Sequence, residues 1–205
     1  MVRVILLASI PMLLSAVELT IDHVTVAGKS LQDMQAALAA AGISSENGGP
    51  HSNHATEMAL TSFPDGSYLE LIALQSAADP QAVAAHAWSK LLQGDAGPAA
   101  WAVRVKDIAA EVERLKSAGV AVGTPVRSGR VRPDGVKLDW ETAQVGKEPN
   151  GTFFPFLIRD YTDRKERAWP GRKPTTKDFS GVTRVVIAVQ DLDEAVKRYQ
   201  EAYGL

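Results

Sequence analysis

Two titratable side chains stand inside apolar runs that have the length and residue types of β-strands. His23 lies in IDHVTVAG, and Glu70 lies in SYLELIAL. Because successive side chains of a strand point to opposite faces, His23 and Thr25 share one face while Val24 and Val26 share the other. A carboxylate inside an apolar strand needs a cation, a metal or several hydrogen-bond donors to offset its burial. His23 and Glu70 are therefore the first candidates for a catalytic pair.

A divalent metal is one partner that this pair would suit. Zn²⁺, Mn²⁺ and Fe²⁺ accept imidazole and carboxylate ligands and leave positions open for a substrate oxygen, which the metal would polarise. The chain has no cysteine, so any transition-metal site must use His and carboxylate ligands. His54 is the candidate third ligand, with His51 nearby, although His51 lies in a Gly-rich turn and His54 could equally face solvent.

An alternative interpretation of the same pair needs no metal. His23 and Glu70 would then form a buried imidazole–carboxylate pair in which each group satisfies the other. Such a pair could also serve as a general base that is held by its carboxylate.

Aromatic and basic residues on other strand-like runs are candidates for substrate binding. Tyr68 shares the face of Glu70, and Trp140 and Phe153 are further aromatic candidates, although a Trp in this pattern is more often a core residue. Arg104 and Arg159 could reach an anionic group with forked donors, or could simply point to water, since each lies near a strand end.

Three further polar residues are most simply explained without a role in a site, although Arg130 and Arg132 lie in a segment that bears a family resemblance given below. His86 lies beside Trp88 in an Ala-rich segment and is predicted to be a surface or packing residue. Arg130 and Arg132 belong to a hairpin with a Pro-Asp-Gly turn and are predicted to be solvated.

The elements that must position these residues recur along the chain. Three segments begin alike, each with a β-rich run that leads into a helix, and three strand-like runs follow each of the first two helices. The predicted N-caps are Ser30, Asp107 and Asp191, and the glycines at which the helices should end are Gly42, Gly119 and Gly204. The pattern predicts a βαβββ unit that occurs twice and then starts a third time.

The repeat divides the chain into six regions. Residues 1–16 are a predicted signal peptide, 19–76 and 99–160 are the two modules, 77–98 are a helical connector, 161–180 are a linker, and 181–205 start an incomplete third module. An unfinished unit would leave an unpaired sheet edge, through which two chains could form a homodimer, unless residues 182–189 join an existing sheet or the natural chain continues.

Composition and the first residues bear on location and partners. The apolar run after Arg3 suits a signal peptide, with Ala16 at the cleavage position, and predicts an exported protein without a stable membrane span after cleavage. Leu14 fits that cleavage site poorly, and the alternative is a first element of the fold in a cytoplasmic protein. The net charge is -2 with both signs interspersed, which argues against nucleic acid as a partner.

Several segments together resemble a known family. They are IDHVTVAG at 21–28, GGPHSNHATEMAL at 48–60, DGSYLELIAL at 65–74, GRVRPDGVKLDW at 129–140 and GTFFPFLIRD at 151–160. The chain from 19 to 160 resembles the glyoxalase-like domain of the vicinal-oxygen-chelate superfamily. This resemblance implies an α+β fold in which tandem βαβββ modules form a curved mixed sheet around a cavity, with helices on the outside. It also implies a divalent metal held by His and Glu residues on the first and last strands of the modules.

The second module departs from the family pattern at the matching positions. Ala100 and Arg184 stand where the first copy has His23, and Pro155 stands opposite Glu70. A half-site of this kind would bind Zn²⁺, Mn²⁺ or Fe²⁺ weakly, or hold no cofactor at all. Two functions stay open: a metal-dependent lyase, isomerase or dioxygenase that acts on a small oxygenated molecule, and a non-catalytic protein that sequesters a small-molecule ligand.

Overall fold

The computed structural model describes residues 19–205. The predicted signal peptide at 1–16 lies outside the described residues. Within the described range, no helix combines the length and the apolar character that a membrane crossing requires.

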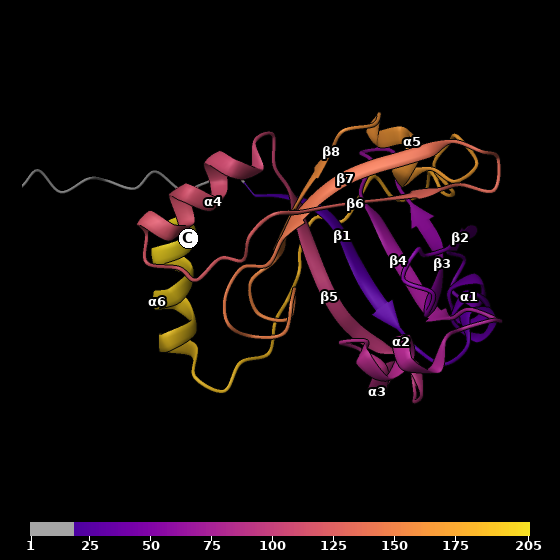
Figure 1. Ribbon diagram of the computed structural model, residues 1–205, viewed down its shortest axis with the longest axis horizontal. Coiled ribbons are helices and arrows are strands. Elements are labelled where there is room, and N and C mark those ends of the chain that lie inside the picture. Colours follow the sequence, from indigo (N-terminus) through magenta and orange to yellow (C-terminus); the bar gives the residue numbers. More distant parts are fainter. Residues whose placement is uncertain (1–18) are drawn as a thin grey trace, which may run out of the picture.

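Eight strands form one mixed sheet (Figure 1). They are β1 (Thr20–Ala27), β2 (Glu46–Pro50), β3 (Thr56–Ser62), β4 (Tyr68–Leu74), β5 (Gly97–Arg104), β6 (Val126–Val131), β7 (Lys137–Ala143) and β8 (Phe156–Asp160). Their order in the sheet is β2-β3-β4-β1-β5-β8-β7-β6. β1 is parallel to β4 and β5 is parallel to β8, whereas β1 and β5 join the two halves as an antiparallel pair. The predicted α+β fold with two βαβββ modules is thereby confirmed.

Residues 19–205 contain six helices. They are α1 (Leu31–Ala40), α2 (Pro80–Ala85), α3 (Ser89–Leu92), α4 (Ile108–Ser117), α5 (Arg164–Ala168) and α6 (Leu192–Tyr203). α1 packs on β3 and β4, and α4 packs on β7 and β8. The three predicted N-caps are confirmed, because the side chains of Ser30, Asp107 and Asp191 accept hydrogen bonds from the backbone of the first helical turn.

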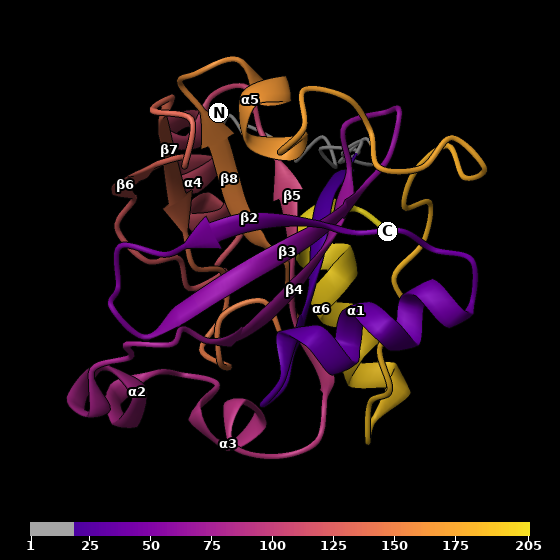
Figure 2. The same cartoon turned by 90° about the vertical axis from the view of Figure 1, so that its right-hand side faces the viewer.

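The sheet curls so that its two outermost strands, β2 and β6, approach each other (Figure 2). Hydrogen bonds from two side chains then join this part of the sheet. The Arg130 guanidinium donates to the Gly48 carbonyl at 2.7 Å, and the Ser52 hydroxyl donates to the Gly129 carbonyl at 3.3 Å. The expectation that Arg130 and Arg132 are solvated is therefore wrong, because both side chains are buried against other segments. The closed edges enclose the space in which the candidate site lies.

Residues 161–180, predicted to be a linker, contain α5 and pack against the rest of the fold. The α5 residues Arg167 and Ala168 are buried. Trp169, directly after the helix, donates its indole N–H to the Phe63 carbonyl at 3.1 Å. The segment therefore closes one end of the sheet instead of separating two modules.

Residues 182–189, predicted to be a strand, form none in the structure. β1 and β5, over which these residues lie, already have hydrogen-bonded strands on both sides, so no sheet edge is free there. Val185 and Ile187 instead pack on the outer apolar core. α6 follows and lies beside α4, where Arg114 donates to the Ala202 carbonyl at 2.8 Å.

Candidate functional site

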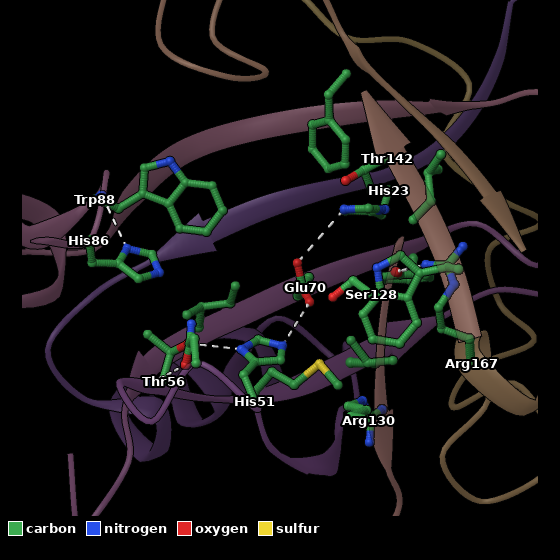
Figure 3. A pocket seen from close by; sticks show the side chains of 18 residues that line it. His23, His51, Thr56, Glu70, His86, Trp88, Ser128, Arg130, Thr142 and Arg167 are labelled. Atoms are coloured by element: carbon green, nitrogen blue, oxygen red, sulfur yellow. Dashed lines mark hydrogen bonds and ion pairs between the residues drawn. The ribbon is translucent and has the colours of Figure 1, made fainter. Parts of the chain in front are cut away.

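The concave side of the sheet holds a cavity of about 380 Å³. This volume is in the range that encloses a small organic ligand. Polar residues that line it are His23, His51, Asn53, Thr56, Tyr68, Glu70, His86, Ser128, Arg130, Thr142 and Arg167, and apolar ones are Met58, Leu60, Ile72, Trp88, Trp140, Phe156 and Ile158 (Figure 3).

The imidazole of His23 is held in one orientation by contacts on the side of the ring that faces away from the cavity. Its Nδ1 lies 2.6 Å from a carboxylate oxygen of Asp22, which is fully buried. The β1–β5 register shifts at Asp22, and such a bulge lets two successive side chains turn toward each other. The imidazole also stacks on Tyr68, with ring centroids 4.8 Å apart and planes 2° from parallel. Its Nε2 is thereby directed toward the cavity.

Asp22 is kept ionised by two cations from α5. Burial would raise the pKa of the Asp22 carboxyl, but the charges of Arg167 and Arg164 and the hydrogen bond with His23 hold that pKa well below its usual range. Arg167 donates to Asp22 at 3.0 Å and to Asp160 at 2.9 Å, and it also contacts the Tyr68 hydroxyl. Because the ionised carboxylate accepts a hydrogen bond from Nδ1–H, a neutral His23 presents the lone pair of Nε2 to the cavity.

Glu70 lies between two imidazoles (Figure 3). Thr25 pairs with it across β1 and β4, and its hydroxyl donates to Oε2 at 3.0 Å. His23 Nε2 is 3.8 Å from Oε2, and His51 Nε2 is 3.6 Å from Oε1. Burial would raise the pKa of Glu70, but the contacts with His51, His23 and Thr25 lower it from 4.5 to about 2. Glu70 is therefore a carboxylate at neutral pH.

His51, not His54, reaches this cluster. His51 Nδ1 lies 2.8 Å from the Thr56 hydroxyl, which directs Nε2 toward Glu70. His54 is exposed, has a left-handed backbone conformation with φ of 57°, and is not among the residues that line the cavity. The structure thus places the candidate third ligand away from His23 and Glu70.

The residues as they stand do not fit a metal ion. Within residues 19–205 no three His, Asp or Glu side chains are arranged to hold one. The two imidazoles address different oxygens of Glu70 and do not converge on one point.

The second module supplies an apolar wall to the same cavity. Thr25 and Ala102 occupy equivalent positions in the two modules, because each lies five residues before the N-cap of the helix that follows. Thr25 pairs with Glu70 on the neighbouring parallel strand, and Ala102 pairs with Phe156 in the same way. The counterpart of Glu70 is therefore Phe156. The expectation of Pro155 was wrong by one residue, because the turns before the two last strands differ in length. Ala100, Ala102, Phe156 and Ile158 form a buried cluster with Trp88 and Trp140 packed against it.

Two of the five predicted substrate-binding residues, Tyr68 and Trp140, line the cavity. The other three lie elsewhere. Arg104 donates to the Ile21 and Asp65 carbonyls, Arg159 lies over the Tyr161 ring, and Phe153 packs against Tyr199 of α6.

Sequence reasoning missed the α5 arginines, Asp22, Arg130 and the connector residues His86 and Trp88. The one available signal was Asp22 itself, because a carboxylate next to a buried imidazole requires cations from somewhere in the chain.

Comparisons with known proteins agree with this architecture. A family model described as a glyoxalase-like domain matches residues 21–204. The crystal structure of a hypothetical protein from Staphylococcus aureus has a TM-score of 0.72 and 18% identity, and the match covers 90% of this chain and 75% of that one. Two methylmalonyl-CoA epimerases also match, each with a TM-score of 0.45. The one from Mycobacterium tuberculosis is 20% identical and covers 69% of this chain and 86% of its own, and the one from Streptomyces coelicolor is 19% identical and covers 69% and 96%. At 18% identity the Staphylococcus aureus structure is evidence of a shared fold alone. No curated protein matches the chain.

Proposed function

This chain belongs to the glyoxalase-like domain family of the vicinal-oxygen-chelate superfamily, and on that premise we propose that it is an enzyme of the isomerase or lyase type. It moves a proton on a small oxygenated molecule, and His23 is its general base. The observation that supports this most directly is the fixed imidazole, whose Nδ1 is bonded to buried Asp22 at 2.6 Å and whose Nε2 faces the cavity.

The chemistry follows from these contacts. Nε2 of His23 takes a proton from a carbon next to a substrate carbonyl, and the electron pair of the C–H bond passes to the carbonyl oxygen as an enolate. Return of the proton to the opposite face of that carbon, or to a neighbouring carbon, completes an isomerisation. In an elimination the electron pair of the enolate forms a C=C bond and expels a leaving group from the neighbouring carbon, and the leaving group takes the proton. Ionised Glu70, 3.8 Å from Nε2, stabilises the imidazolium that forms between the two steps.

Solvent deuterium exchange tests the proposal without a known product. The protein is incubated in D₂O with a panel of small oxo acids and hydroxy ketones, and loss of the C–H signal is followed by ¹H NMR. We expect exchange with wild type and a loss of at least 100-fold in His23→Gln. Arg159→Gln, which alters an arginine outside the cavity, is the matched control. Binding of panel members without exchange would favour the non-catalytic, sequestering alternative, and exchange that survives in His23→Gln would contradict the role of His23.

A metal-dependent lyase, isomerase or dioxygenase is the second candidate. It is favoured by one observation, that Glu70 has an imidazole Nε2 near each of its carboxylate oxygens, that of His23 at 3.8 Å and that of His51 at 3.6 Å. The test is a titration of the protein with Zn²⁺, Mn²⁺ and Fe²⁺ while the melting temperature is measured. An increase that disappears in His23→Ala would support the metal, since a ligand of the folded state stabilises it. No response to any of the three ions would remove this candidate.

A further inference from the structure

Three arginines of residues 19–205 are buried, and they differ in their partners. Arg132 is paired with Asp134 at 2.8 Å and Glu166 at 3.0 Å, and Arg167 is paired with Asp22 and Asp160. Arg130 is 8% exposed, and its one hydrogen bond within the described residues goes to the neutral Gly48 carbonyl. No carboxylate of residues 19–205 lies within ion-pairing distance of it. A buried cation without an anion is costly, unless a ligand supplies the anion.

Arg130 is directed at the cavity by the pleat of its strand. On β6 it shares a face with Ser128, which pairs with Trp140 of β7, and all three residues line the cavity. Figure 3 shows Arg130 at the edge of the cluster that surrounds Glu70. Burial lowers the pKa of the Arg130 guanidinium, the opposite of the direction for paired Arg167.

We propose that Arg130 binds the carboxylate of the substrate, so that this site takes small carboxylic acids with an apolar body. The inference rests on the proposed function of the cavity and names its substrate class. The guanidinium presents forked donors that match a carboxylate. Trp140 and Phe156 offer the apolar wall for the body of the molecule. A singly charged acid neutralises one unpaired cation, whereas a doubly charged phosphate would leave excess negative charge near Glu70.

The experiment compares acids with their neutral isosteres by isothermal titration calorimetry. The probes are phenylacetate, 3-phenylpropionate and isovalerate, the corresponding amides, and phenyl phosphate. Wild type should bind at least one acid about 10- to 100-fold more tightly than its amide, as expected for a charge-assisted hydrogen bond. Arg130→Gln, which retains a donor for the Gly48 carbonyl, should lose this preference, and Arg159→Gln should keep it.

Each outcome of the experiment is decisive. Equal affinity of wild type for acids and amides, or no binding of either kind, would overturn the proposal without need of a variant. Retention of the acid preference in Arg130→Gln would also overturn it. If wild type binds phenyl phosphate more tightly than the carboxylic acids, the proposed substrate class is wrong and the ligand of Arg130 is a phosphate. If Arg130→Gln does not fold, Arg130→Lys keeps the charge and should keep a weaker preference for the acid. The acid preference should survive in His23→Gln, so failure of the general base and failure of this inference are distinguishable.

Discussion

The two modules share a backbone plan and differ in the chemistry of the face that each turns to the cavity. In the first module, β1 and β4 present His23 and Glu70, with Asp22 behind them. At the matching positions of β5 and β8, the second module presents alanines and Phe156. The strand pairing that aligns Thr25 with Glu70 aligns Ala102 with Phe156. Duplication of a fold therefore preserves where side chains point, while the residue types give one half titratable groups and the other half an apolar surface.

The largest expected effect on stability comes from the ion pairs that Arg167 forms with Asp22 and Asp160. Arg167→Met would leave buried Asp22 and partly buried Asp160 with less compensating charge, and we expect the free energy of unfolding to fall by about 3–5 kcal/mol. Urea denaturation measures it. Arg159→Met, in the second module, should cost less than about 1 kcal/mol, because Arg159 only lies over the Tyr161 ring. Similar losses for both variants would mean that these ion pairs contribute little.

Glu70 contributes to the free energy of unfolding in a way that depends on pH, whereas its counterpart Phe156 has no group that titrates. A carboxyl whose pKa falls from 4.5 to about 2 on folding stabilises the folded state above pH 4.5, and this contribution is lost as the pH falls from 4.5 toward 2. Glu70→Gln should be less stable than wild type by about 1–3 kcal/mol at pH 7. The gap between the two proteins, measured by urea denaturation at successive pH values, should narrow through that window. A gap that stays constant would contradict the lowered pKa.

The smallest expected effect on stability comes from replacing the helix N-caps. Replacement should have a similar effect in both modules. Ser30 caps α1 and Asp107 caps α4 through equivalent hydrogen bonds of 3.1 Å. Ser30→Ala and Asp107→Ala should each lower the free energy of unfolding by about 1 kcal/mol. A loss in only one of them, as measured by thermal denaturation, would show that the two helices do not have equivalent roles.

Local patterns in the sequence predicted most of the fold. Strand alternation placed His23 and Glu70 on the cavity side, and the capping residues fixed the starts of three helices, because these signals depend on neighbours in the chain. The predicted strand at 182–189 failed for a non-local reason. Its residue pattern is that of a strand, but the sheet has no free edge where the segment lies.

The sequence by itself determined the repeated βαβββ plan and the two residues around which the candidate site is built. Only the tertiary structure decided what surrounds them. Arg167 meets Asp22 from 145 positions away, and Arg130 meets Gly48 across the gap between the two outermost strands. Contacts of this kind depend on how far the sheet curls and on where α5 packs against it. Neither property follows from the periodicity of the residues along the chain.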